Sequence, residues 1–316
     1  MAYQIGTDEA GYGPNLGPLT ICGTRWIVPQ EEIELYELLS LSVSNRPGDK
    51  SRIAICDSKA LYKSSGTIAN LERSVLSLLF GAFEILPTNL AELESLLHCE
   101  VDFSPEKLFR NCKSEISLPM AANPAEVEDL GLRFRNDCQT RSVAIDQVVC
   151  KAIFPERFNS LIKCCGNKAE LLSTQSIDIV HQLLAPCSTN VNITCDRHGG
   201  RSKYLGLINQ YLTTDFVSIQ FEKQHASQYR WLKDDSAISL EFRTGGESFL
   251  PAALSSMIAK YVRELTMQIW NQFWALKVPG IKPTKGYPVD ARRFRSEITA
   301  AMKELKIAEQ LVWRSR

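Results

Sequence analysis

The sequence predicts an α/β domain with a mixed central β-sheet flanked by helices. Segments rich in β-branched and apolar residues alternate along the chain with segments of helical periodicity, the pattern of strands interleaved with helices. The first two strands, residues 3–9 and 19–28, are joined by a turn rich in glycine and proline, so we expect an antiparallel pair at the start. With 316 residues and 44% hydrophobic residues, the chain can bury a large core. We expect residues 1–316 to form one domain.

Composition excludes several classes of function. Lys+Arg 36 balances Asp+Glu 36, so a nucleic-acid surface would have to be a local patch. The chain has no continuous apolar stretch of about 18 residues and no signal-peptide pattern, so we expect no membrane partner and a cytoplasmic location. The 10 cysteines are scattered without paired zinc-like spacing. We therefore expect buried reduced thiols and no disulfide framework.

The periodicity predicts the remaining elements. We expect helices at 67–80, 89–98, 141–165, 168–184, 203–212, 250–276 and 290–312. We expect further strands at 81–87, 190–196, 215–221 and 237–242. Between residues 99 and 137, prolines punctuate polar segments without a sustained period, which predicts an irregular region.

Acidic residues stand where strands end. Asp8 and Glu9 close the first strand, and Asp196 closes the strand at 190–196. Glu247 follows two glycines just before the longest predicted helix, so it is a third candidate position. If the two strands are neighbours, their acids would repel one another unless a cation lay between them. Carboxylates of this kind suit Mg²⁺ or Mn²⁺.

Each acid alone has a simpler interpretation, because an acid at a strand end is more often a turn former or a helix cap than a ligand. Asp57-Ser58 has the pattern of a helix N-cap, and His198 lies in a glycine-bearing turn that suggests a surface residue rather than a base. The acidic positions gain weight only in combination.

Five blocks of sequence resemble the type 2 ribonucleases H, the family of ribonucleases HII and HIII. The opening Asp-Glu-Ala-Gly-Tyr-Gly-Pro at residues 8–14 is similar to the family's Asp-Glu-Ala-Gly-Arg-Gly-Pro. The other four blocks occur in the family's order: Asp-Ser-Lys-Ala-Leu at 57–61, the strand ending at Asp196, the helix segment at 253–260 and Lys-Gly-Tyr-Pro at 285–288.

The resemblance implies a ribonuclease H-like fold, with insertions near residues 30–50 and 99–140 and a helical part from about residue 250. It also implies an endonuclease that hydrolyses the RNA strand of RNA/DNA hybrids, or cleaves ribonucleotide-containing duplex DNA, and leaves 5′-phosphomonoesters. Asp8, Glu9, Asp196 and Glu247 would be the catalytic acids holding two Mg²⁺ or Mn²⁺ ions. The implied substrate-binding residues are Gly11, Tyr12, Gly13, Lys59 and Tyr287.

The chain departs from the family's pattern at two of these positions. Glu247 stands where the family has an aspartate, and its extra methylene lets it reach a cation from a retracted backbone. Tyr12 replaces the arginine between two glycines in a turn that holds the ribonucleotide through backbone contacts near the 2′-OH, the group by which proteins distinguish RNA from DNA. Gly11 and Gly13 preserve the close backbone approach, while the guanidinium contact to phosphate is lost.

Three alternatives stay open. The first is a divergent nuclease of the same fold that acts on DNA or structured RNA. The second is a protein that binds hybrids without cleaving them. The third, a cysteine-based redox or zinc protein, is poorly supported by the cysteine spacing.

Overall fold

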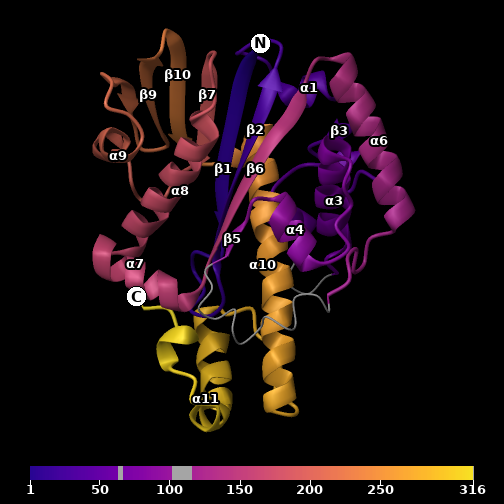
Figure 1. Ribbon diagram of the computed structural model, residues 1–316, viewed down its shortest axis with the longest axis vertical. Helices are drawn as coiled ribbons and strands as arrows, with labels where there is room; N and C mark the ends of the chain where they lie inside the picture. Colours follow the sequence, from indigo (N-terminus) through magenta and orange to yellow (C-terminus); the bar gives the residue numbers. More distant parts are fainter. Residues whose placement is uncertain (63–66, 102–115, 316) are drawn as a thin grey trace.

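A computed structural model describes residues 1–62, 67–101 and 116–315 and has a mixed β-sheet at its centre (Figure 1). Within these residues the central sheet has 8 strands in the order β5-β6-β2-β1-β7-β10-β9-β8. β1 pairs antiparallel with β2 and parallel with β7, and β7 pairs parallel with β10. The prediction of a mixed sheet that starts with an antiparallel pair is confirmed.

The strands of the central sheet are β1 (Ala2–Ala10), β2 (Leu19–Val28), β5 (Glu100–Val101), β6 (Ala144–Ile153), β7 (Val191–Asp196), β8 (Ser218–Glu222), β9 (Ala226–Lys233) and β10 (Ser236–Arg243). A separate parallel pair consists of β3 (Val43–Ser44) and β4 (Ile53–Ala54). The α-helices are α1 (Leu35–Leu38), α2 (Ser58–Leu61), α3 (Ala69–Phe83), α4 (Leu90–Leu96), α6 (Pro124–Thr140), α7 (Pro155–Cys165), α8 (Lys168–Leu184), α9 (Leu205–Tyr211), α10 (Leu250–Lys277) and α11 (Pro288–Glu304).

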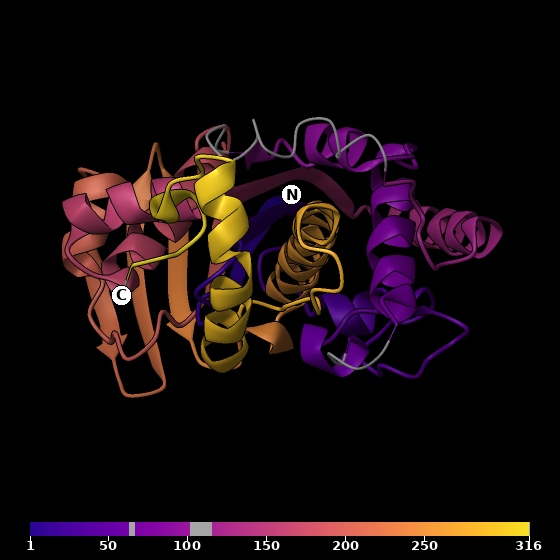
Figure 2. The same ribbon diagram turned by 90° about the horizontal axis from the view of Figure 1, so that it is seen from below.

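Helices cover both faces of the sheet. Alternating strand residues point to opposite faces, and Ile21 of β2 belongs to one buried apolar cluster whereas its neighbour Cys22 belongs to the other. The cluster of Cys22 is shared with α3, α6 and α10, and that of Ile21 with α7, α8 and α9. In Figure 2, α10 accordingly lies between the sheet and the group formed by α3 and α6.

The longest helix lies directly against the first strand. A Cβ atom on Gly6 of β1 would lie 2.1 Å from the backbone nitrogen of Ala252, so β1 and α10 meet backbone to backbone. The Ser255 hydroxyl donates to the carbonyl of Gly6 at 2.8 Å. This contact fixes α10 beside the strand that carries Asp8 and Glu9.

Three expectations for secondary structure are wrong. Residues 144–153 form strand β6 rather than the first half of a helix, because their β-branched run pairs with β2 and the helix begins only at Pro155. Residues 81–83 continue α3 instead of starting a strand. Within the region expected to be irregular, residues 102–115 lie outside the described residues, but α6 is a regular helix that begins after the Asn123 cap.

Two glycines allow α3 and α6 to pack closely. A Cβ atom on Gly81 of α3 would lie 2.6 Å from the carbonyl oxygen of Gly131 in α6. Such an atom cannot be accommodated without separating the helices, because the obstacle is backbone. By contrast, Gly206 of α9 is exposed and has nothing within 4 Å of its Cβ position.

We predict that Gly81→Ala lowers the free energy of unfolding by about 1–3 kcal/mol through overpacking, although alanine is the better helix former. Gly206→Ala is the matched control and should raise it by about 0.5–1 kcal/mol, the intrinsic helix preference alone. Urea unfolding followed by circular dichroism measures both. Equal effects of the two substitutions would show that the α3–α6 contact is not tight.

Candidate functional site

Three predicted acids come together at the ends of two neighbouring parallel strands. Asp8, Glu9 and Asp196 each offer a carboxylate oxygen, and these oxygens lie within 4.8 Å of one another. The register explains the arrangement, since Thr7 of β1 pairs with Cys195 of β7 and the next residue on each strand is an aspartate. All three side chains are partly exposed and can be reached from outside.

The three acids destabilise one another's ionised forms. Burial, followed by the charge of Asp196, raises the pKa of Asp8 to about 7. Hydrogen bonds from Ser256 and from the Glu9 backbone lower the same pKa but do not offset this rise. Burial and the charge of Asp8 hold the pKa of Glu9 well above its usual range. Burial also raises the pKa of Asp196. The site therefore concentrates negative charge that a cation would relieve.

The donor set fits a hard divalent cation. It consists of carboxylate oxygens, the ligands that Mg²⁺ and Mn²⁺ prefer, with no thiol or imidazole in the group formed by the described residues. Lys59 lowers the pKa of both Glu9 and Asp196, so its exposed ammonium lies near the acids. Asp57 acts as the N-cap of α2, accepting from the Lys59 backbone N–H at 2.9 Å, as its sequence pattern predicts.

Glu247 lies beside the three acids without joining their group. Its charge contributes to the raised pKa of Asp8 and of Asp196. It sits on a single 3₁₀ turn, Gly246–Ser248, and the Gly246 N–H donates to Asp196 Oδ1 at 3.3 Å. Its backbone is thus tied to one acid of the group, although its carboxylate is not among the oxygens that lie within 4.8 Å of one another.

Residues 11–17, which we call the glycine turn, follow the strand that carries Asp8 and Glu9. Gly11 has φ +86°, a conformation that side chains rarely adopt, and Gly13 has open space at its Cβ position. Tyr12 is half-buried, and burial followed by the charge of Glu9 raises its pKa, so its phenol lies close to that acid. The turn therefore presents backbone beside the carboxylates.

The Lys-Gly-Tyr-Pro loop packs against the same turn. The carbonyl of Gly286 accepts from the N–H of Asn15 at 2.7 Å. A Cβ atom on Gly286 would lie 2.5 Å from the carbonyl oxygen of Leu16, so the two segments touch through bare backbone. Tyr287 is 53% exposed, which leaves its ring free to meet a ligand.

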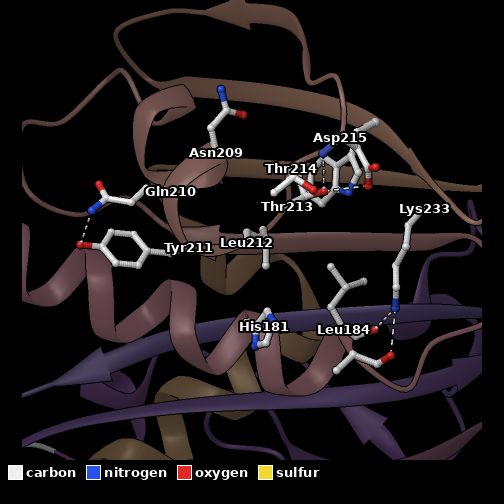
Figure 3. Close-up of a pocket in the computed structure, with 12 residues that line it drawn as sticks. His181, Leu184, Asn209, Gln210, Tyr211, Leu212, Thr213, Thr214, Asp215 and Lys233 are labelled. Atoms are coloured by element: carbon white, nitrogen blue, oxygen red, sulfur yellow. Dashed lines mark hydrogen bonds between the residues drawn. The ribbon is translucent and has the colours of Figure 1, made fainter.

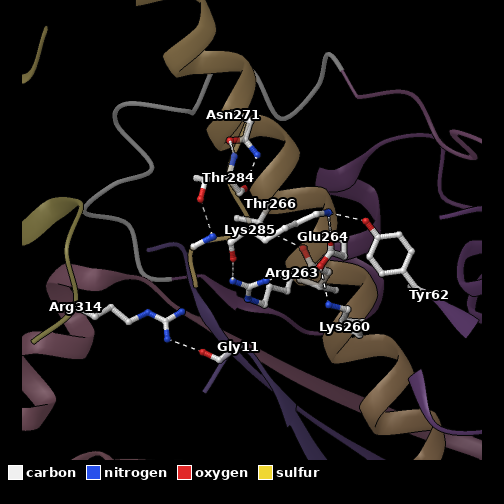
Figure 4. A network of polar contacts seen from close by, with 12 residues as sticks. Gly11, Tyr62, Lys260, Arg263, Glu264, Thr266, Asn271, Thr284, Lys285 and Arg314 are labelled. Carbon is white, nitrogen blue, oxygen red and sulfur yellow. Dashed lines mark hydrogen bonds and ion pairs between the residues drawn. The ribbon is translucent and has the colours of Figure 1, made fainter. Parts of the chain in front are cut away.

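A buried ionic network that the sequence analysis missed supports this loop (Figure 4). Glu264 of α10 is 5% exposed; its carboxylate contacts Lys260 at 2.8 Å and also pairs with Lys285. Burial raises the pKa of Glu264, but the two lysines outweigh this and hold it below its usual value. Lys285 also donates to the Tyr62 hydroxyl at 2.6 Å. Glu264 lies just beyond the matched block at 253–260, and its distance from Lys285 in sequence hides the pairing.

The expectation that His198 is a surface residue is wrong. It is 2% exposed, and burial lowers its pKa to about 3, with Arg201 as the second cause. Its Nδ1 lies 3.1 Å from the Ser173 hydroxyl, and its ring meets Tyr204 and Phe242 edge to face. His198 is therefore a neutral core residue behind Asp196.

One cavity of about 410 Å³ lies between α8, α9 and β9 (Figure 3). His181, Asp215 and Trp231 are among its lining residues, and Lys233 at its edge donates to the carbonyls of Leu184 and Ala185. None of the predicted site residues lines it. No helix in the described residues is both long and apolar enough to cross a membrane, and the described cysteines are free.

No protein-family model matches the chain, and no curated protein matches it. Several solved structures do match the chain. Ribonuclease H2 from Pyrococcus horikoshii shares 15% identity with a TM-score of 0.46, covering 98% of this chain and 92% of that one. Ribonuclease HII from Archaeoglobus fulgidus, in a complex with PCNA, shares 14% identity with a TM-score of 0.44, covering 99% and 94%.

A third solved structure is Bst ribonuclease HIII in complex with Mn²⁺. It shares 12% identity with a TM-score of 0.47, and the match covers 99% of this chain and 66% of that one. Ribonucleases HII and HIII are the enzymes that the five sequence blocks resemble.

The crowding of charge at the three acids gives a prediction for the metal-free protein. Asp8→Asn removes one of three mutually repelling carboxylates and should raise the free energy of unfolding at pH 8, in EDTA, by about 1–2 kcal/mol. The control is Asp129→Asn, because Asp129 forms an exposed ion pair with Arg133; its effect should stay within about 0.5 kcal/mol. Urea unfolding measures both. Destabilisation by Asp8→Asn would show that the carboxylate is compensated in the folded protein.

Proposed function

We propose that this chain is a metal-dependent endoribonuclease that hydrolyses the RNA strand of RNA/DNA hybrids or cleaves at RNA–DNA junctions. The observation that carries the proposal is the grouping of Asp8, Glu9 and Asp196 next to a glycine turn of exposed backbone. Two divalent ions held there would activate the attacking water and stabilise the leaving 3′-oxygen. The proposal takes residues 1–316 as one catalytic domain, with insertions near 30–50 and 99–140.

The acids have distinct parts in this proposal. Asp8, Glu9 and Asp196, whose carboxylate oxygens lie within 4.8 Å of one another, would hold the ions. Glu247 would complete the set of ligands by rotation of its side chain toward the ions. Its 3₁₀ turn is already hydrogen-bonded to Asp196 through the Gly246 N–H. No covalent nucleophile is needed, because charge placement supports the reaction.

The surrounding residues supply substrate contacts. Lys59 places an exposed ammonium beside the acids, where it would meet a phosphate. Gly11 gives the turn its φ of +86°, and the open space beside Gly13 would let backbone approach the ribose. Tyr287 offers an exposed ring to the sugar that follows. Tyr12 is packed against an apolar cluster and offers no cation to a phosphate. This residue is the feature that favours the alternative of a nuclease acting on DNA or structured RNA.

The first test is cleavage itself. With Mg²⁺ or Mn²⁺, purified protein should cut labelled duplexes that carry a ribonucleotide stretch or a single ribonucleotide, and EDTA should stop the reaction. Asp8→Asn should lower kcat by about a hundredfold or more, as expected for loss of a group that stabilises the transition state, while Asp129→Asn should match wild type.

The substrate panel separates the alternatives. Cleavage confined to all-DNA or structured-RNA substrates would favour the divergent nuclease, and hybrid affinity without cleavage, unchanged by EDTA, would favour a binding protein. Equal inactivity of wild type and Asp8→Asn on every substrate would overturn the proposed enzyme.

The part played by Glu247 has its own test. Glu247→Gln keeps the size of the side chain and removes its charge, so it should weaken Mn²⁺ binding and lower kcat by about tenfold or more. Glu247→Asp shortens the reach and should lie between wild type and Glu247→Gln. Isothermal titration with Mn²⁺ and single-turnover cleavage measure the two effects. Wild-type values for Glu247→Gln would remove Glu247 from the metal site.

A further inference from the structure

The glycine turn is hydrogen-bonded to the segment Trp313–Ser315, which is nearly 300 residues away in sequence. Trp313 forms an antiparallel bridge with Leu16, and the Arg314 N–H donates to the carbonyl of Asn15 at 2.9 Å. The Arg314 side chain then reaches back under the turn. Its Nε donates to the carbonyl of Gly17 at 2.7 Å. Its Nη1 donates to the carbonyl of Gly11 at 2.6 Å (Figure 4).

Arg314 is an unusual buried cation. It is 0% exposed, and no ion pair joins it to an acid within the described part of the chain. Burial and the nearby charge of Arg263 lower its pKa well below the usual range. A buried charge is costly unless other groups compensate it. Besides the ring of Phe158, 5.1 Å away, the compensating groups are the two glycine carbonyls at the ends of the turn.

Other elements fix the position of this arginine. The Asn159 side chain of α7 donates to the carbonyl of Trp313 at 2.8 Å and accepts from the Ser315 N–H at 2.6 Å. The Trp313 ring lies under the Arg295 guanidinium of α11 at 4.8 Å. The segment Trp313–Ser315 is thus anchored to two helices, so its hold on the turn does not depend on the turn.

A second buried arginine, Arg263, also contacts Gly11. A Cβ atom on Gly11 would lie 2.3 Å from Arg263 Nε, so the Gly11 backbone rests directly on that side chain. Arg263 is 1% exposed and donates to the carbonyl of Lys285 at 2.9 Å. The Gly11 residue therefore contacts two buried arginine side chains, Arg314 through its carbonyl and Arg263 at its Cα.

The hydrogen bond from Arg314 to the Gly11 carbonyl sets the direction of one backbone donor. The carbonyl of Gly11 and the N–H of Tyr12 belong to the same planar trans peptide, so they point in opposite directions. Because Arg314 binds that carbonyl, the Tyr12 N–H points away from Arg314. In the described part of the chain this N–H has no hydrogen-bond partner. A ligand hydroxyl can take that place.

We propose that Arg314 is a positioning residue that aims the Tyr12 N–H at the 2′-hydroxyl of the substrate and thereby sets the preference for ribose over deoxyribose. The inference rests on the proposed function, because it assumes a ribonucleotide at the glycine turn. Arg314 lies beneath the turn and does not touch the substrate; its planar fork spans both carbonyls, which a lysine cannot do with the same geometry.

The test compares Arg314→Met with Arg314→Lys, using Arg25→Met as a control. Arg25 is a buried arginine of β2 that pairs with Asp146, away from the turn, so its loss costs stability without altering the site. Anisotropy in EDTA measures affinity for a duplex with one ribonucleotide and for the same duplex in DNA. We expect wild type to prefer the ribonucleotide by about tenfold, the value of one hydrogen bond.

Arg314→Met should reduce this preference to near one, and Arg314→Lys should restore part of it. Cleavage of the ribonucleotide duplex by Arg314→Met should fall about tenfold in kcat/KM, with unchanged Mn²⁺ affinity. Thermal unfolding identifies any general loss of structure, and Arg25→Met should keep the wild-type preference. An unchanged preference in both Arg314 variants would overturn the inference while wild-type cleavage leaves the proposed function intact; absence of cleavage by wild type would count against the proposed function instead.

Discussion

The repulsion between carboxylates at the ends of β1 and β7 is the constraint around which the surrounding structure is arranged. The parallel register places Asp8 and Asp196 side by side, and Glu9 adds a third charge within the same 4.8 Å group. Burial and neighbouring negative charge raise the pKa of these carboxyl groups, so ionisation opposes their grouping. The rest of the fold must supply the free energy that keeps the three acids together. That free energy comes from burial of the sheet between two apolar layers.

Bare backbone lets neighbouring segments reach these acids. Gly6 admits α10 against β1, Gly246 brings its N–H to Asp196, and Gly286 admits the loop after α10 against the glycine turn. At each point a side chain would collide with or crowd the neighbouring backbone. Close packing of main chain, rather than an extended side-chain network, therefore brings the elements of the site together, while buried charges at Glu264 and Arg314 secure the loops at its edge.

Sequence reasoning succeeded where the determinants are local and failed where they are distant. The long helix at 250–276 and the cap at Asp57 were predictable, because periodicity and capping chemistry lie within a few residues. Strand β6 was not, because its pairing with β2 outweighs its helical spacing. The burial of His198 depends on Tyr204 and Phe242 packing around it, and the role of Arg314 depends on carbonyls at Gly11 and Gly17. No local pattern around these two residues encodes those contacts.

The two departures from the family's sequence pattern differ in how the structure accommodates them. Glu247 stands on a turn whose backbone is bonded to Asp196, so the longer side chain can be brought to the acids by rotation about its own bonds. At Tyr12 the backbone is the constrained part, because the preceding Gly11 is held by Arg314 and packs on Arg263. A change of residue at position 247 therefore alters the reach of one ligand. A change at position 12 leaves the backbone donor in place and replaces only what the side chain offers to the substrate.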